Sequence, residues 1–62
     1  HAYITRARLR FAVNLLLQTR LNVKEIAAKC GYTEYSVFYR AFRKRIGMSP
    51  EALREAGYRP DI

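Results

Sequence analysis

The sequence predicts an all-α domain of four helices, and three observations carry that prediction. Short polar residues flanked by apolar ones stand at Asn22, Thr33 and Ser49, where they are typical of the residue that caps a helix start. The preceding segment, residues 2–18, contains neither glycine nor proline and is rich in residues that favour a helix. No segment shows the alternation of apolar and polar residues that is typical of a strand. A chain of 62 residues holds one small core at most, so a single domain is expected.

The first predicted helix, residues 2–18, is apolar around more of its circumference than one packing surface needs. One face leans apolar at helical spacing and consists of Ile4, Arg8, Leu9, Ala12, Leu15 and Leu16. Phe11, Val13 and Leu17 extend the apolar surface around the second half of the helix. Two interpretations stay open: the three later helices cover this surface, or a second subdomain that is absent from this chain packs on it.

The second predicted helix begins after Asn22 and spans about eight residues. The side chain of Asn22 caps the helix, and Glu25 at the third helical position can reach back in a capping box. Leu21 before the cap and Ile26 within the helix form a hydrophobic staple. The helix ends before Gly31, because a left-handed backbone conformation is expected at that turn.

The third predicted helix spans residues 34–45, with Thr33 as its cap. Tyr32 and Val37 stand where they can close another hydrophobic staple around that cap. Gly47 ends the helix in a left-handed conformation. The segment mixes large aromatic side chains with basic ones, which indicates that its two sides have different environments.

The two faces of that third helix separate when its residues are spaced by about 100° each. Phe38 and Phe42 lie four residues apart on one face, which favours burial of that face, and Tyr35, Ala41 and Ile46 share it. The opposite face carries short side chains followed by basic ones: Thr33, Ser36, Val37, Arg40, Arg43 and Lys44. We therefore expect the helix to anchor in the core on one side and to present a cationic, hydrogen-bonding edge on the other.

The fourth predicted helix begins after Ser49. This cap repeats the earlier pattern, with Met48 and Leu53 as the apolar pair of the staple. Pro50 occupies the first helical position, where a missing N–H leaves no hydrogen bond unmade. Glu51 follows it, where the helix dipole favours an acidic side chain.

The second and third predicted helices, joined by a tight turn at residues 30–32, have the arrangement of a helix-turn-helix. In that motif the second helix enters the major groove of DNA, and its N-terminal half meets the base edges. The charge of the chain suits such a partner, since its formal net charge is +7 and its pI is near 10.2. The sequence therefore predicts a module that binds double-stranded DNA.

A longer pattern surrounds this motif. The run IAAKCGYTEYSVFYRAFRKRIGMSPEALR resembles the second helix-turn-helix of the AraC-type (AraC/XylS) transcription regulators. The matching positions are Ile26-Ala27, Gly31-Tyr32, Ser36, Phe38, Arg40, Phe42, Arg43-Lys44, Gly47, Ser49-Pro50 and Leu53-Arg54. Upstream, YITRARLRFAVNLL resembles the helix that links the two helix-turn-helix units of that family. The resemblance divides the chain into a linker helix at 1–20, a second helix-turn-helix subdomain at 21–57 and a C-terminal tail at 58–62.

The resemblance implies a larger protein than this chain. A first helix-turn-helix subdomain would precede residue 1, with an effector-sensing or dimerisation domain before or after the pair. The whole protein would regulate transcription, and we expect it to be an activator. The single cysteine of this chain, together with the lack of a membrane-spanning run and of a visible secretory leader, predicts a cytoplasmic protein. Neither the residues nor the resemblance require a cofactor.

Three residues of the third helix are expected to contact bases: Ser36, Val37 and Arg40. Arg40 can donate two hydrogen bonds to guanine, and the resemblance implies a DNA contact at its position. A phosphate contact or an intramolecular ion pair is the alternative for Arg40. Ser36 can bond a base or a phosphate, and Val37 can touch a thymine methyl unless it serves the staple with Tyr32.

Phosphate contacts are expected from a second set: Asn22, Lys24, Thr33, Arg43 and Lys44. Arg43 and Lys44 lie farther along the helix, where it leaves the groove, so they position the protein without reading the sequence. Thr33 is a cap first, and the backbone N–H groups near it can hold a phosphate. The helix that begins after Asn22 usually lies across the DNA backbone in this fold. Arg54 is expected to brace the fold near the last helix.

An enzyme is not expected. Cys30 is the only candidate nucleophile, but it adjoins the turn, where a small buried residue is expected, and the only histidine is His1. The sequence holds no carboxylate pair, no metal-ligand spacing and no phosphate-binding loop. It also lacks the run of about 20 apolar residues that a membrane helix needs, and its single cysteine fits a reducing compartment.

A second class of function stays open. The same fold could contact RNA polymerase or the absent subdomain through one of its helices, with the basic face being incidental. Salt separates the two classes, because log affinity for DNA falls with log salt by about 0.9 for each phosphate contacted. An apolar protein interface responds far less.

Overall fold

A computed structural model describes residues 2–61, and within them the chain forms four α-helices and no strand. The helices are α1 (Ala2–Gln18), α2 (Val23–Lys29), α3 (Tyr35–Ile46) and α4 (Pro50–Ala56). The predicted all-α class is confirmed. His1, at the start of the predicted linker helix, and Ile62, at the end of the predicted tail, lie outside the described residues. Within the described range, none of the helices combines the length and the apolarity that a membrane crossing requires.

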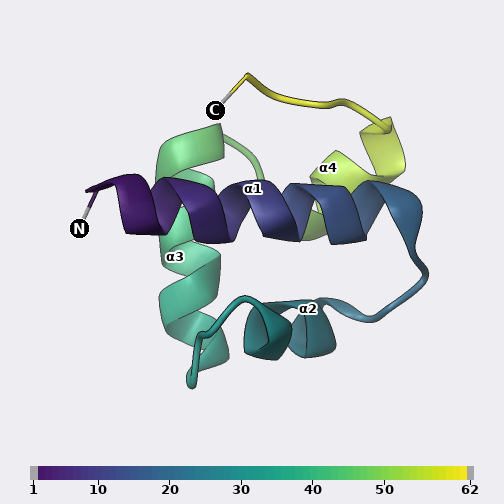
Figure 1. The fold of residues 1–62 in the computed structure, drawn as a ribbon. Coiled ribbons are helices and arrows are strands. Elements are labelled where there is room, and N and C mark those ends of the chain that lie inside the picture. The colour runs from purple at the N-terminus through teal and green to yellow at the C-terminus, as the bar shows by residue number, and fades with distance from the viewer. Residues whose placement is uncertain (1, 62) are drawn as a thin grey trace.

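The long helix α1 supports the helix-turn-helix pair from behind. It packs against α2 and α4, and each of these also packs against α3. Figure 1 shows α3 crossing behind α1 at a steep angle, with α2 below them and α4 near the C-terminal half of α1. This arrangement leaves the far side of α3 open to solvent.

The core draws on all four helices and on the turn between α2 and α3. Its buried members are Leu9, Ala12, Val13, Leu16, Ile26, Ala27, Cys30, Phe38, Phe42 and Leu53. Phe38 and Phe42 are fully buried, with their ring centroids 5.6 Å apart, as their spacing on α3 predicts. The aromatic side of α3 is therefore the side that anchors it.

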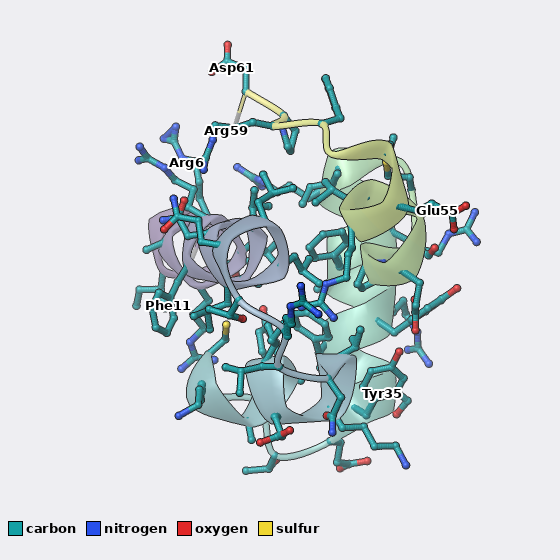
Figure 2. All side chains as sticks on the ribbon, turned by 90° about the vertical axis from the view of Figure 1, so that its right-hand side faces the viewer. Arg6, Phe11, Tyr35, Glu55, Arg59 and Asp61 are labelled. Atoms are coloured by element: carbon teal, nitrogen blue, oxygen red, sulfur yellow. The ribbon has the colours of Figure 1, made fainter. Side chains whose placement is uncertain are left out.

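The apolar surface of α1 is divided between the core and solvent. Val13 is buried, and Leu15 and Leu17 pack against the core, so the later helices cover this part of the surface. Ile4 and Phe11 stay 45% and 46% exposed, and Figure 2 shows Phe11 on the outer side of α1. The later helices thus cover Val13, Leu15 and Leu17, as the first of the two interpretations predicted. That an absent subdomain covers Ile4 and Phe11 stays a prediction.

Two of the three predicted helix caps are confirmed by their hydrogen bonds. The Oδ1 atom of Asn22 accepts a hydrogen bond from the Glu25 N–H at 2.8 Å. The Oγ atom of Ser49 accepts one from the Ala52 N–H at 3.1 Å, and Pro50 comes next at the start of α4. Each cap satisfies an N–H group that has no partner within its own helix, which stabilises the helix by about 1 kcal/mol.

The prediction that Thr33 caps the third helix is wrong. The residue that precedes α3 is Glu34, whose backbone is extended at φ −123° and whose side chain makes no capping hydrogen bond. Helix α3 therefore spans residues 35–46 and not 34–45. Thr33 lies in the bend before Glu34, with its side chain exposed.

Aromatic packing in the turn explains this start. Tyr32 packs edge-on against Phe38, with ring centroids 5.4 Å apart, whereas Val37, its predicted staple partner, is 49% exposed. Two aromatic rings bury more apolar area than a tyrosine and a valine do. The contact between the rings therefore sets the path of the chain into α3.

Two glycines adopt the left-handed conformation predicted for them. Gly47 has φ 92°, and its N–H bonds the carbonyl of Arg43 at 2.8 Å, which closes the end of α3. Gly31 has φ 93°, and a Cβ atom there would lie 3.4 Å from the guanidinium of Arg8. The same guanidinium stands over the ring of Tyr32, 5.4 Å from its centre. Through Arg8, α1 contacts the turn of the helix-turn-helix directly.

The C-terminal tail, which the sequence pattern left unassigned, returns along α1. The Nη1 atom of Arg59 donates a hydrogen bond to Oδ1 of Asn14 at 2.6 Å, and Pro60 is half-buried. Figure 1 shows the tail running back over α1, and Figure 2 shows Arg59 on that same side of α1. The tail therefore lies on the side of α1 that faces away from α2.

Candidate nucleic-acid interface

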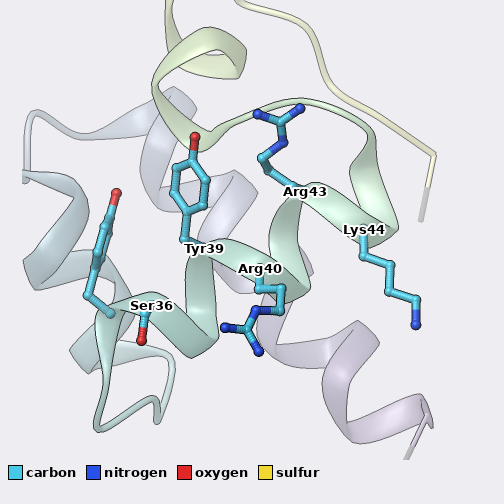
Figure 3. Close-up of a pocket in the computed structure, with 6 residues that line it drawn as sticks. Ser36, Tyr39, Arg40, Arg43 and Lys44 are labelled. Carbon is cyan, nitrogen blue, oxygen red and sulfur yellow. The ribbon is translucent and has the colours of Figure 1, made fainter.

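The solvent side of α3 carries the predicted contact residues of that helix in one continuous strip. We call it the outer strip, and its members, all exposed, are Ser36, Val37, Arg40, Arg43 and Lys44. All of them except Val37 line an open groove of about 760 Å³ along the helix (Figure 3). Because the opposite side of α3 is buried in the core, the strip stands on a fixed backbone.

Arg40 projects from the middle of the outer strip. None of the side-chain hydrogen bonds recorded within residues 4–61 involves it, so the alternative of an intramolecular partner finds no support in that range. Figure 3 shows its guanidinium standing clear of the helix. A free guanidinium presents two parallel N–H groups, which is the geometry that guanine O6 and N7 accept.

Val37 is available for an outside contact as well. The sequence left it with two uses, a staple with Tyr32 or a contact to DNA. Tyr32 instead packs on Phe38 and under Arg8, and Val37 remains 49% exposed. Its two methyl groups therefore form an apolar point at the edge of a polar strip.

The remaining predicted contacts lie outside the groove. Asn22 and Lys24 are exposed at the start of α2, at the end of that helix farther from the turn, and the Oδ1 atom of Asn22 already serves the cap. Thr33 is exposed in the bend that precedes α3. The structure thus brings together the outer strip of α3, but it does not place these three side chains in the groove.

Two tyrosines that the sequence interpretation did not assign to the interface complete the groove. Tyr35 and Tyr39 line it, with ring centroids 5.9 Å apart. The hydroxyl of Tyr35 donates a hydrogen bond to the Glu51 carboxylate at 3.1 Å. Burial, with help from Glu51, raises the pKa of Tyr35 above its ordinary value. The spacing of Tyr39, three residues after Ser36 and four before Arg43, was the available signal. An aromatic residue on a partly buried helix is, however, ordinarily assigned to the core.

Arg54 braces the fold, as predicted. Its Nε atom donates a hydrogen bond to the Leu16 carbonyl at 3.0 Å, and its Nη2 atom donates one to the Thr19 carbonyl at 3.3 Å. The Leu16 carbonyl lies in the last turn of α1, where backbone acceptors have no partner within the helix, and the Thr19 carbonyl follows that turn directly. The side chain therefore ties α4 to α1 and stays out of the groove.

The environment of Cys30 opposes a catalytic role. The side chain is buried, and desolvation raises its pKa to about 11, although the Arg8 guanidinium acts in the opposite direction. A thiol with that pKa carries almost no thiolate near neutral pH, and the thiolate is the nucleophilic form. Among the described residues no three histidine, cysteine or acidic side chains gather as metal ligands.

The raised pKa of Cys30 predicts a loss of stability in alkali. The ordinary value is 9.0 and the folded value is about 11, so the fold favours the neutral thiol. The resulting stabilisation is complete below pH 9 and is lost as the pH rises through 11, by at most about 3 kcal/mol in total. Tyr35, whose pKa is also raised, adds a loss of the same sign above pH 10. Urea unfolding measured from about pH 8 to about pH 11 should show a smaller decline for Cys30→Ala than for wild type; equal declines would contradict the assignment.

Comparison with known proteins agrees with this geometry. A family model described as a helix-turn-helix domain matches residues 1–56. The transcriptional regulator AlkR of Acinetobacter baylyi is 41% identical over 54 residues, which are 87% of this chain and 18% of AlkR. The xylose operon regulatory protein of Haemophilus influenzae is 39% identical over 54 residues, covering 87% of this chain and 14% of that protein. The transcriptional regulator AdiY of Escherichia coli is 38% identical over 47 residues, 76% of this chain and 19% of AdiY.

These relatives are much longer than this chain. The aligned part spans 14 to 19% of their lengths. No solved structure is a significant match. The likeness therefore concerns one module, and it covers the turn and the outer strip together.

Proposed function

Because the chain belongs to the AraC-type helix-turn-helix family, whose model spans residues 1–56, we propose that it is a DNA-binding module of a transcription regulator. In this proposal α3 enters the major groove with its outer strip toward the bases. The observation that carries it is the exposed basic and polar strip on a helix whose other side is locked by two buried phenylalanines. A major groove about 12 Å wide admits a helix presented in this way.

The position of each residue on α3 supports a division of labour. Ser36, Val37 and Arg40 lie in the first half of the helix, which in a helix-turn-helix meets the base edges. We assign Arg40 to guanine, Ser36 to a base or a neighbouring phosphate, and Val37 to a thymine methyl. Arg43 and Lys44 lie in the last turn of α3, and we assign both to phosphates.

Contacts outside α3 would fix the register of the module on the duplex. Lys24 and Asn22 lie at the start of α2, the helix that crosses the DNA backbone in this motif, and both are exposed. Thr33 lies in the bend that leads into α3 and is exposed too. We propose phosphate contacts for all three. The Asn22 contact would come from its amide nitrogen, because its oxygen serves the cap.

Several wider expectations stay predictions. They concern the whole regulator: its role as an activator, its location in the cytoplasm, a contact with RNA polymerase, and a first helix-turn-helix subdomain with an effector-sensing or dimerisation domain. The division of this chain at residues 20 and 57 has the same standing. The names of the relatives support regulation of transcription for those proteins.

Selection of bound duplexes from a random DNA pool, at one fixed salt concentration, tests the proposed function. The wild-type chain should enrich a short motif. Arg40→Ala should weaken binding by about 1–3 kcal/mol and lose the preference at one base pair, because a bidentate base contact disappears. Lys44→Ala is the matched control and should weaken binding to all sequences alike while reducing the salt slope by about 1.

Two results would contradict parts of this assignment. If Arg40→Ala weakens all sequences equally, Arg40 contacts a phosphate and reads no base. If the affinity of the wild-type chain for every duplex is no higher than its affinity for an uncharged polymer, the DNA-binding proposal itself fails. Circular dichroism of each variant before selection ensures that only folded protein is compared.

The second candidate function, a protein-interaction module, is favoured by one observation. Ile4 and Phe11 remain about half exposed on α1. Figure 2 shows Phe11 on the side of α1 away from α3, and Ile4, seven residues earlier, shares its face of the helix. Such a surface suits a protein partner, with the basic strip then being incidental. A binding constant that hardly changes with salt would favour this candidate, whereas a steep linear fall in log affinity supports DNA.

A further inference from the structure

The groove on α3 has two flanks with different chemistry. At about 100° per residue, Tyr39 and Arg43 lie close together on one flank, and Lys44 lies about 140° from Tyr39 on the other. Figure 3 shows the side chains of Tyr39 and Arg43 extending toward the same side, where the chain continues into α4. In that view Lys44 points away from them. Arg40 stands between the two flanks.

The two tyrosines of the groove differ in whether their hydroxyl groups are occupied. The Tyr35 hydroxyl donates to the Glu51 carboxylate. Within residues 4–61 no hydrogen bond is recorded for the Tyr39 hydroxyl, which lies at the open groove. A phenol at a wet surface normally keeps its ring on apolar neighbours and offers its O–H to a polar partner. The ring of Tyr39 has an apolar neighbour in Tyr35, but its O–H has no recorded polar partner within residues 4–61.

The ring of Tyr39 is held in place. It is half-buried and packs against Tyr35, which is itself fixed by its bond to Glu51. A tyrosine has only two side-chain torsions, so its hydroxyl can be positioned with little loss of conformational freedom. The hydroxyl therefore marks a fixed point on the flank that also carries the exposed guanidinium of Arg43.

We infer that Tyr39 and Arg43 together bind one phosphate of the DNA strand on the α4 side of α3, while Lys44 binds the opposite strand. The inference rests on the proposed function and adds a residue and a strand assignment to it. The phenol O–H would donate to one phosphate oxygen, and the guanidinium would donate to another and supply the charge. Because the two DNA backbones border the major groove, flanks about 140° apart on an inserted helix face different strands.

Removal of single hydroxyl groups tests the role of Tyr39. The probe is the duplex that the wild-type chain enriches, and its affinity is measured across a salt series. Tyr39→Phe should weaken binding roughly tenfold, since a hydrogen bond to a charged oxygen is lost. The slope against log salt should not change, because a neutral phenol displaces no counterion, whereas Arg43→Ala should reduce the slope by about 1. Tyr35→Phe is the comparison variant and should weaken binding much less than Tyr39→Phe, because its hydroxyl is bonded to Glu51 and only steadies the neighbouring ring.

Neutral backbone analogues test the strand assignment, because each removes the charge of one chosen phosphate. A methylphosphonate is placed at each phosphate in turn, and the affinity of each modified duplex is compared with that of the unmodified duplex. At one position, on one strand, the modification should weaken binding of wild type. The same modification should hardly change the affinity of Tyr39→Phe or Arg43→Ala, because these variants have already lost that contact. The position at which Lys44→Ala becomes insensitive should lie on the other strand. Insensitive positions on the same strand for all three variants would overturn the strand assignment.

The outcomes keep this inference separate from the proposed function. If wild type binds the selected duplex and Tyr39→Phe binds it equally well, the phosphate site at Tyr39 is wrong and DNA binding stands. If Tyr39→Phe and Tyr35→Phe lose affinity to the same extent, the loss reflects the packing of the ring pair and the inference is again wrong. If wild type binds no DNA, both proposals fail.

Discussion

Phe42→Ala is expected to unfold the domain, at a cost of about 3–5 kcal/mol. Phe42 is fully buried, packs against the tilted ring of Phe38 with centroids 5.6 Å apart, and anchors the middle of α3 in a core shared by all four helices. Small domains have only about 5–15 kcal/mol of stability, and the smallest lie at the low end of that range. The loss should appear in urea unfolding monitored by circular dichroism as a midpoint near or below zero denaturant.

Phe11→Ala is the matched control for that change. It removes the same side chain from a helix position that is 46% exposed, and alanine is a better helix former than phenylalanine. Its effect should stay within about 1 kcal/mol. If the two variants lose equal stability, the side of α3 placed in the core is wrong, and with it the outward position of the outer strip.

The helix bounds illustrate how much local sequence determines. α1 was predicted to the residue, because its segment is rich in residues that favour a helix and the Asn22 cap of the next helix limits how far it can run. α2 and α4 begin after Asn22 and Ser49, where the cap side chain has no rival for the first free N–H groups. These features depend on neighbours within four residues, so a single sequence contains all the information that they need.

The start of α3 shows where local reasoning ends. Thr33 satisfies the sequence rule for a cap, yet the helix begins two residues after it because Tyr32 packs on Phe38. That choice depends on a core that several helices build together. The contact of Arg8 with Tyr32 and that of Arg59 with Asn14 join residues 24 and 45 positions apart, and no periodicity in the sequence points to either pair.

The residues of the candidate interface also fall into those that local sequence places correctly and those that depend on the tertiary fold. Helical periodicity was enough to place the outer strip on one exposed face, since side chains on a regular helix share a face whatever the rest of the fold does. Tyr39 lies at the border of that face, where it is half-buried against Tyr35. Asn22 and Lys24 were predicted as contacts from the motif, but their distance from the groove depends on how α2 is oriented. Residues at borders and on neighbouring elements are therefore the ones that sequence places least well.

Arg54→Ala is expected to destabilise the domain by about 3 kcal/mol, as two charge-assisted hydrogen bonds are lost and two backbone acceptors are left without a partner. The guanidinium reaches from α4 to the carbonyls of Leu16 and Thr19, at the end of α1 where the helix dipole concentrates negative charge. A salt bridge on the surface would contribute far less, because water would replace it. The midpoint of thermal unfolding, measured by circular dichroism, should fall accordingly.

Two further variants decide which property of Arg54 matters. Arg54→Lys keeps the charge near the end of α1 but cannot present two N–H groups in a fixed fork, so it should recover only part of the lost stability. Arg45→Ala removes an exposed arginine for which no hydrogen bond is recorded within residues 4–61, and its effect should stay within about 0.5 kcal/mol. Full recovery by lysine would show that charge alone acts at this site.

Because the side chain of Arg54 turns toward α1, the Arg54→Ala variant should retain the site preference of wild type in duplex selection at a temperature where it is folded. A changed motif would instead place Arg54 at the DNA and contradict its role as the tie between α1 and α4.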